Sequence, residues 1–157
     1  MLLGGNKMKQ LISLLIIIIL LFTLSGCVKH VEDTNGVDDF TIQTYTDADI
    51  ESGKTSSTKF GSVETTINNN THLKVSKFTG VEELLSTKAT NQTLIYNVES
   101  TCKQGNFRIV ILKDGSIIRD VRINSKETIT LENCNGRYKL MMVGESAKID
   151  IKYSVSK

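Results

Sequence analysis

Phe107-Arg-Ile-Val-Ile-Leu-Lys-Asp-Gly-Ser-Ile-Ile-Arg-Asp-Val-Arg-Ile123 is the stretch that decides the fold class of this chain. Asp114-Gly115 separates two runs of β-type residues. This dipeptide favours a two-residue hairpin turn, because both turn positions of a type I′ turn need a positive φ. Residues 107–113 are apolar on both faces except for Arg108, which predicts a central strand. The stretch therefore predicts an antiparallel hairpin inside the core of a β domain.

The same pattern continues on both sides of this hairpin. Short runs rich in Ile, Val, Thr and Tyr are bounded by Asn and Gly clusters, as in all-β domains. The expected strands are 62–67, 73–78, 94–101, 107–113, 116–123, 128–131, 138–143 and 148–155. One helical turn is expected over 80–86, where apolar residues have helical spacing. The sequence therefore predicts one antiparallel β-sandwich of seven or eight strands over residues 60–157, either immunoglobulin-like or jelly-roll-like.

The start of the chain carries an export signal. Lys7 and Lys9 precede Leu11–Leu24, in which only Ser13 and Thr23 are not apolar, and no acidic residue occurs before Glu32. A charged region, an apolar region and a small-residue cleavage site follow one another in this order in secretory signal peptides. Residues 1–26 are therefore expected to be a signal peptide, translated from Met1 or from Met8.

Leu24-Ser25-Gly26-Cys27 resembles the lipobox of bacterial lipoproteins. The resemblance implies that the Cys27 thiol carries a diacylglyceryl group with palmitate-type chains, and that the signal is cut between Gly26 and Cys27. Two acyl chains suffice for stable membrane attachment. An uncleaved transmembrane anchor and plain secretion are the alternatives, and the 14-residue apolar run is short for a membrane span.

Two further resemblances concern the folded part. Asn135-Gly136-Arg137-Tyr138, taken as a strand start, partly resembles the tyrosine corner of immunoglobulin-like sandwiches, with Cys134 where an Asp is usual. Residues 91–155 are similar to the C-terminal β-sandwich of uncharacterised Gram-positive lipoproteins. The chain's composition, rich in Ile, Asn and Lys, agrees with such a source. These resemblances imply a fold and no activity.

Residues 27–59 are expected to form an acidic tether between the anchor and the domain. One island inside it, 39–45, alternates like a strand at Phe40 and Ile42. It is either an edge strand of the domain or a segment that binds a partner.

Charge is balanced overall but uneven along the chain. Without residues 1–26 the chain has 17 basic and 17 acidic residues, whereas residues 101–157 carry eleven bases against six acids. A basic half suits an anionic polymer or lipid headgroups. Scattered, solvated charge is the alternative. The sequence has no dense run of basic residues, so it does not indicate a nucleic-acid partner.

Two cysteines in an exported domain usually form a disulfide, which makes Cys102 and Cys134 the candidate pair. Three expected strands separate them, and consecutive antiparallel strands reverse direction. The two cysteines are thus expected at opposite ends of the sandwich, too far apart for a disulfide. The sequence therefore favours two free thiols, with a Cys102–Cys134 disulfide as the less favoured alternative.

No catalytic or metal site stands out. His30 and His72 have no Cys or carboxylate at ligand spacing, and the acids of Asp47-Ala-Asp49-Ile-Glu51 only faintly resemble a calcium loop. Glu82 and Glu83 are adjacent, which is poor geometry for a catalytic carboxylate pair. We expect no enzyme activity, no metal and no cofactor.

These observations favour a lipid-anchored protein on the extracytoplasmic face of the cell membrane. We expect it to act as a binding or structural module of the envelope, with an envelope protein or polymer as partner. The first alternative is an accessory subunit that docks on another envelope protein by strand addition. The second, an enzyme, has the least support.

Overall fold

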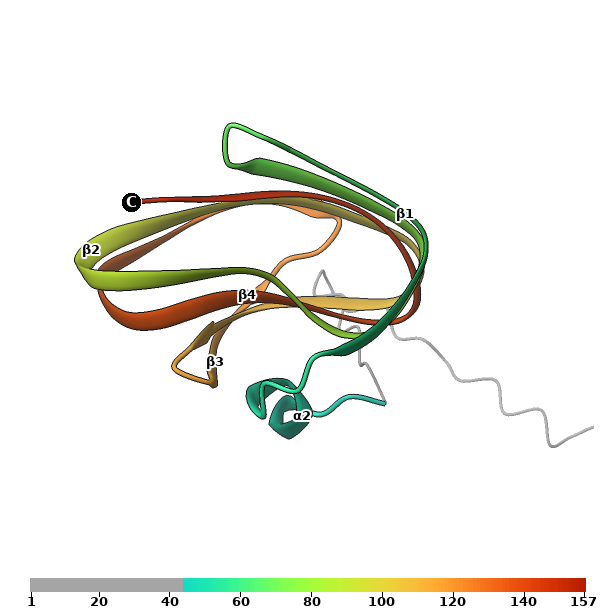
Figure 1. Cartoon of the computed structure of the whole chain (residues 1–157), viewed down its shortest axis with the longest axis horizontal. Coiled ribbons are helices and arrows are strands. Elements are labelled where there is room, and N and C mark those ends of the chain that lie inside the picture. Colours follow the sequence, from blue (N-terminus) through green and yellow to red (C-terminus); the bar gives the residue numbers. More distant parts are fainter. Residues whose placement is uncertain (1–43) are drawn as a thin grey trace, which may run out of the picture. The chain divides into compact units, whose positions relative to one another are not determined.

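The computed structural model describes residues 44–157, which are mostly β (Figure 1). The elements are α2 (Asp47–Glu51), β1 (Ser56–Ile67), β2 (Asn70–Lys113), β3 (Ser116–Val121) and β4 (Ser125–Ser156). The four strands form one antiparallel sheet with the order β1-β2-β3, and β4 pairs with β2. This confirms the prediction of an antiparallel, mostly β protein. Within these residues, no helix is long and apolar enough to cross a membrane.

The structure has four strands where the sequence predicted seven or eight, because several of the expected strands are segments of one continuous strand. β2 has 44 residues and contains the runs expected at 73–78, 94–101 and 107–113, while β4 has 32 residues and contains the last three. The residues expected to end strands bend them instead. Asn133, Gly136 and Ser146 all have positive φ angles inside β4. Local backbone chemistry thus marks each corner. The pairing of β4 with β2 shifts register near Asn133 and Ser146 and resumes beyond them, so the strand does not end there.

Gly105 illustrates such a corner in β2. Its φ is +75°, and a Cβ at this position would collide with the backbone oxygens of Glu145 and Ser146. Only glycine combines this φ with such a close approach of two backbones. The connection between the expected strands 94–101 and 107–113 is therefore a tight bend within β2.

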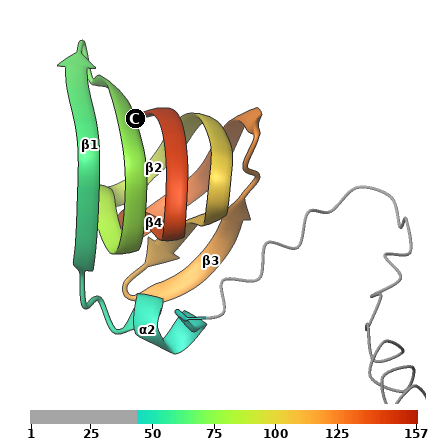
Figure 2. The ribbon, with the colours of Figure 1, turned by 90° about the vertical axis from the view of Figure 1, so that its right-hand side faces the viewer.

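The pairing divides into two groups of segments. In the first group, β1 pairs with 70–81 of β2, and residues 71–78 pair with 147–153 of β4. The end of β4 also pairs with 95–104 of β2, which pairs in turn with 125–130 of β4. Figure 2 shows β1, β2, β4 and β2 again side by side.

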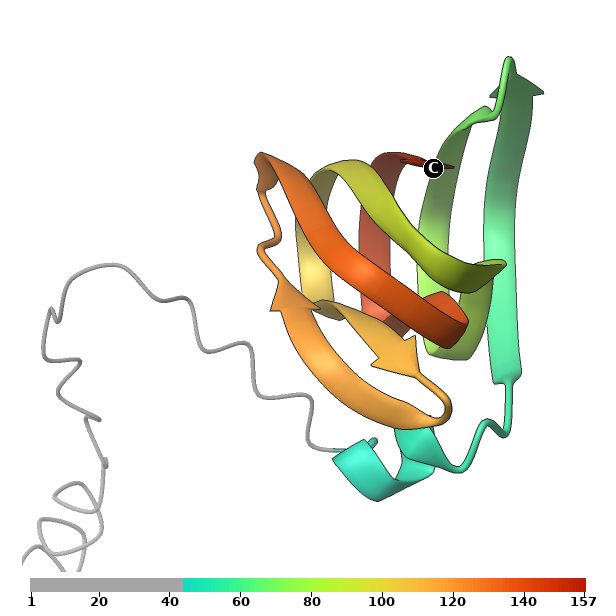
Figure 3. The ribbon, with the colours of Figure 1, turned by 90° about the vertical axis from the view of Figure 1, so that its left-hand side faces the viewer.

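In the second group, residues 80–92 of β2 pair with 134–144 of β4. The same part of β4 pairs on its other edge with 106–113 of β2, whose end forms the hairpin with β3. Figure 3 shows this group from the other side. Residues 107–113 thus have a strand on each edge, as predicted for a central strand.

The main core is built from one face of both groups. Phe107, Ile109 and Ile111 point into it, as does Tyr96. The other members come from all parts of β2 and β4, and they include Leu73, Val75, Phe78, Leu94, Val98, Tyr138, Leu140, Met142, Ile149, Ile151 and Tyr153. The alternation along β2 and β4 therefore defines one buried face and one outer face.

A second, smaller cluster lies on the opposite face of the second group. Val110 and Leu112 alternate with the main-core residues of the same strand and pack with Ile50 of α2. Val81, Met141 and Val143 complete the cluster, with Tyr45 and Ile117 at its border. This accounts for a strand that is apolar on both faces: α2 and Tyr45 cover its second face.

One turn forms as predicted and one expected element does not. Asp114 and Gly115 have φ angles of +48° and +97°, which confirms the hairpin turn. Asn68 and Asn69 make the two-residue turn between β1 and β2, also with positive φ. The helical turn expected over 80–86 is wrong, since these residues are part of β2.

Part of the range expected as tether has regular structure. α2 spans Asp47–Glu51, and β1 begins at Ser56 rather than at residue 62. Thr46 caps α2 by accepting a hydrogen bond from the backbone of Asp49, whose carboxylate in turn accepts from the backbone of Thr46. The expected edge strand at 39–45 lies almost wholly outside the described residues.

Candidate functional site

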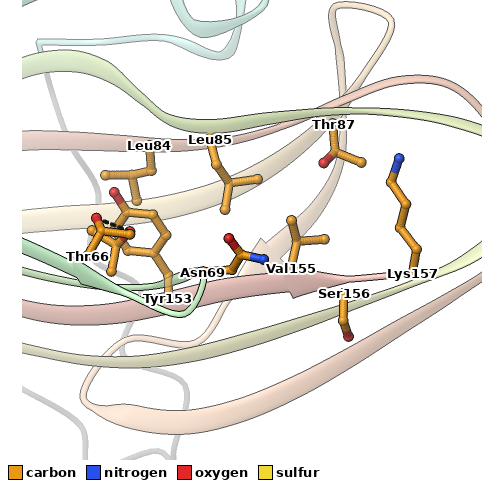
Figure 4. A pocket seen from close by; sticks show the side chains of 10 residues that line it. Thr66, Asn69, Leu84, Leu85, Thr87, Tyr153, Val155, Ser156 and Lys157 are labelled. Atoms are coloured by element: carbon orange, nitrogen blue, oxygen red, sulfur yellow. Dashed lines mark hydrogen bonds between the residues drawn. The ribbon is translucent and has the colours of Figure 1, made fainter.

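A groove beside the β1–β2 turn is the candidate binding site. It has a volume of about 580 Å³ and lies between the turn, the middle of β2 and the end of β4 (Figure 4). Its lining residues are Thr66, Asn69, Thr71, Leu84, Leu85, Thr87, Tyr153, Val155, Ser156 and Lys157. Three segments that are far apart in the sequence thus converge on one cavity.

The interior of the groove is apolar. Leu84 and Leu85 point across it toward Tyr153 and Val155 (Figure 4). Both leucines are half-buried and pack against the main core. The β2–β4 pairing has a β-bulge between Glu83 and Leu85. A bulge breaks the strict alternation of a strand, which explains why consecutive leucines both line the groove.

The rim of the groove is polar and almost uncharged. The hydroxyls of Thr66 and Thr71 lie 3.0 Å apart. Burial, the largest influence, and the nearby Glu64 carboxylate raise the pKa of Tyr153, partly offset by a hydrogen bond with Thr71, so its hydroxyl is neutral at pH 7. The ammonium of Lys157 donates to the carbonyl of Lys88 at 3.0 Å. Hydroxyl and amide groups around an apolar floor suit an uncharged ligand.

Cys102 and Cys134 are both free thiols. The Cys102 Sγ donates to the carbonyl of Gln104 at 3.3 Å, and the Cys134 Sγ donates to that of Leu131 at the same distance. Cys134 pairs with Gln92, ten residues before Cys102 along β2, a separation of roughly 30 Å in an extended strand. Burial raises the pKa of the Cys102 thiol.

Tyr96 and Tyr138 lie close to Cys134 in the main core. Burial, with Cys134 and Tyr138 nearby, raises the pKa of Tyr96 to about 12. Its hydroxyl has no hydrogen-bond partner among the described residues. Tyr138 lies inside β4 and not at a strand start, which removes the position on which the tyrosine-corner comparison depended.

The acids that faintly resembled a calcium loop have structural partners instead. Asp47 pairs with Arg108 of β2 at 2.5 Å, and Asp49 takes part in the cap of α2. The Glu51 carboxylate accepts from the backbone of Ile117 at 2.8 Å. Among residues 44–157, no group of three or more His, Cys, Asp or Glu side chains has the geometry of a metal site.

The adjacent carboxylates Glu82 and Glu83 have different partners. Glu82 accepts from Lys59 at 2.6 Å, whereas Glu83 pairs with Lys139 at 2.7 Å. They therefore belong to separate ion pairs on different strands. His72 bonds to Asp150 at 2.7 Å, on the outer face of the first group of segments.

The lipidation residue Cys27, the cleavage residue Gly26 and His30 lie outside the described residues. Comparisons with models of protein families and with curated proteins find no match for the chain.

Sequence reasoning missed the groove. Its polar residues are ordinary strand and turn residues, and its two leucines were assigned to a helical turn. The only local signal is the doublet Leu84-Leu85 within a strand-like context. That doublet marks a bulge, but it does not indicate which distant segments complete the cavity.

Proposed function

We propose that this chain is a lipid-anchored binding module on the extracytoplasmic face of the cell membrane. The lipobox-like Leu24–Cys27 supports the anchor. The groove beside the β1–β2 turn is the observation that carries the binding role, because apolar side chains and hydroxyl and amide groups line it together, with Lys157 as the one charged side chain among them. Among residues 44–157, no cluster of side chains supports a catalytic role as strongly as this groove supports a binding role.

The lining of the groove indicates the class of ligand. Leu84, Leu85 and Val155 offer apolar contact, while Thr66, Thr87 and Asn69 offer hydroxyl and amide groups. An uncharged ligand with one apolar side and one hydroxyl-bearing side matches both sets of groups. A charged ligand would meet only Lys157, which already bonds to a backbone carbonyl.

Nuclear magnetic resonance titration tests this binding role. The probes are octyl glucoside below its micelle concentration and the tetramer of N-acetylglucosamine. We expect at least one of them to shift the resonances of Leu84, Leu85 and Val155, and Leu85→Arg to abolish the shift. Ile118→Arg, an exposed apolar residue on β3, is the matched control. No shift with either probe, or shifts that Leu85→Arg leaves intact, would overturn the proposal.

The anchor has a separate test. The full chain should partition into the detergent phase of a Triton X-114 extraction and incorporate labelled palmitate. Cys27→Ala should abolish both and block processing between residues 26 and 27. Normal processing of that variant would contradict the lipobox interpretation.

We also infer that the two groups of paired segments are the two layers of a jelly-roll β-sandwich. The order of segments supports this. β1 and 70–81 lie beside 147–156, 95–104 and 125–130 in one group, while 80–92 lies beside 134–144, 106–113 and β3 in the other. Each long strand contributes to both groups, and the main core takes residues from both. Antiparallel strands that exchange between two packed layers are the hallmark of jelly rolls.

One feature supports the alternative of an accessory subunit. Every residue of β1 is exposed, with Phe60 75% exposed, and within residues 44–157 β1 has a partner on one edge only. Long exposed edges accept strands from other chains. If β1 holds a partner in the membrane, Phe60→Lys should dissolve the complex and Ile118→Lys should leave it intact, as measured by native electrophoresis of mild detergent extracts.

A further inference from the structure

The outer face of the first group of segments is exposed and carries a row of charged residues. Register places Thr65, His72, Lys152, Glu99 and Lys126 side by side across five segments. Directly opposite residues in an antiparallel sheet project from the same face. Their neighbours along the strands, such as Leu73 and Ile151, are buried in the main core, which identifies this row as the outer face.

A second row runs parallel to the first. Register places four residues side by side in this second row: Val63, Lys74, Asp150 and Thr101. Lys148 is on the same strand and face as Asp150, two residues away, and is exposed. We call this surface the basic face. Its charged members are His72, Lys74, Lys126, Lys148, Lys152, Glu99 and Asp150.

Lysines outnumber carboxylates on the basic face. Lys152 pairs with Glu99 at 2.9 Å and Lys74 with Asp150 at 3.3 Å. Lys126 and Lys148 form no ion pair within the described part of the chain. Four lysines against two carboxylates leave an excess positive charge even while His72 is neutral. The lysines of both ion pairs remain about half exposed, at 57% for Lys74 and 52% for Lys152.

Two aliphatic side chains stand at the rim of the same face. Val63 and Ile67 are each 65% exposed, and they lie opposite Lys74 and Asn70 on the edge strand β1. Exposed aliphatic side chains beside lysines are the combination that binds the interface of an anionic bilayer, where apolar groups enter the headgroup region and the ammonium groups stay at its surface.

The anchor keeps this face close to a bilayer. Sixteen residues, 28–43, lie between Cys27 and Thr44, and a chain of that length reaches at most about 60 Å when fully extended. Attachment at such short range raises the effective concentration of headgroups, so weak contacts suffice.

The outer face of the second group is already occupied. Ile50 of α2 and Tyr45 cover its apolar residues, and Arg108 joins Asp47 of α2 to Asp120 of β3. The basic face differs from it in being positively charged and in having no element of residues 44–157 packed over it.

We propose that the basic face docks on the anionic headgroups of the bilayer that holds the anchor. This inference rests on the proposed lipid anchor. It assigns the domain a preferred side toward the membrane, with the ligand groove at the end of the strands near the β1–β2 turn.

Vesicle binding tests the proposal. The protein is the mature chain, residues 27–157, with Cys27→Ala so that it carries no acyl chain. It is sedimented with vesicles of phosphatidylcholine containing 30% phosphatidylglycerol, and with phosphatidylcholine alone, at low and high salt. We expect binding to the anionic vesicles only, and a large loss at high salt, because the Debye length shortens.

Charge-reversal variants locate the binding surface. Lys126→Glu with Lys148→Glu should weaken binding about tenfold or more. The matched control is Lys54→Glu with Lys113→Glu, which changes net charge equally at exposed lysines outside the basic face, and it should change binding less than threefold. Val63→Ser with Ile67→Ser should weaken binding several-fold while leaving its salt dependence unchanged. Circular dichroism checks that each variant folds.

Three results would overturn the proposal: equal binding to neutral vesicles, equal losses in the two double-lysine variants, and stronger binding to soluble polyglycerol phosphate than to anionic vesicles. The last result would assign the basic face to an envelope polymer. None of these results bears on the anchor, because palmitate labelling of the full chain tests that separately.

Discussion

Arg119 of β3 donates to the buried carboxylate of Glu127 in β4 at 2.8 Å, across the short connection between the two strands. Glu127 is only 8% exposed, and it also accepts from the backbone N–H of Arg122 at 3.0 Å. Burial raises the pKa of Glu127, but the hydrogen bonds from Arg119 and Arg122 outweigh it, and the pKa lies below its ordinary value of 4.5. The ionised carboxylate therefore holds this connection in place.

The pH dependence of stability should reveal this carboxylate. A carboxyl group with a lowered pKa in the folded state contributes stability that is present above its unfolded pKa and lost as pH falls through its folded pKa. We expect the free energy of unfolding, measured by urea titration, to fall between about pH 5 and pH 3. Glu127→Gln should cost about 1–3 kcal/mol at pH 7 and lose less on acidification. Glu132→Gln, an exposed residue of the same strand, is the control, and an equally steep acid loss in Glu127→Gln would count against this role.

Ile50 should contribute more to stability than a five-residue helix suggests. Its side chain is fully buried against Val110 and Met141. Truncating a buried isoleucine typically costs about 2–5 kcal/mol. Ile50→Ala should therefore lower the unfolding free energy by at least about 2 kcal/mol and speed hydrogen exchange at the Ile117 amide, which Glu51 holds. A cost below about 0.5 kcal/mol would show that α2 is not packed on the sheet in solution.

Two glycines with similar φ angles should differ in their tolerance of alanine. Gly105 and Gly53 have φ angles of +75° and +67°, but a Cβ at Gly53 meets nothing within 4 Å, whereas one at Gly105 collides with the backbone of Glu145. Gly53→Ala should cost about 1–2 kcal/mol, from backbone strain alone. Gly105→Ala should cost clearly more, as measured by thermal unfolding. Equal costs would mean that the bend at Gly105 is looser than described.

The cysteines should remain separate under oxidising conditions. Mass spectrometry of the unreduced protein, alkylated in denaturant, should find both Cys102 and Cys134 modified. Without denaturant, half-buried Cys102 should react faster than buried Cys134. Cys134→Ser should cost less than the ~2–5 kcal/mol typical of losing a native disulfide. A covalent Cys102–Cys134 peptide would refute the register of β2 and β4 between them.

Much of the fold could be predicted where local chemistry determines it. Asp114-Gly115 requires positive φ at both positions, so its hairpin was predictable from two residues. The two apolar faces of residues 107–113 were also a reliable indication of a central strand. Strand ends were not predictable, because Gly105 and Gly136 allow a bend as readily as a turn, and only distant partners decide between them.

The groove was unpredictable for a different physical reason. Val81, Leu84 and Leu85 have helical spacing, but a β-bulge at Leu84 produces the same spacing in a strand. Propensity alone does not distinguish the two, and the pairing of β2 with β4 decided the outcome. Leu85 and Tyr153 come together only because distant segments of β2 and β4 pair in a particular register. A single sequence does not show that register directly.

The pairing of the strand ends also governs how quickly this domain can form. Tyr153 pairs with both Thr71 and Val98, so the last residues of β4 are enclosed between two parts of β2 that precede Tyr153 by 82 and 55 residues. Chains dominated by such distant pairings fold in milliseconds to seconds, far more slowly than helical bundles. Only the β1–β2 and β2–β3 hairpins are available early, and a growing chain stays uncommitted until its final strand is made.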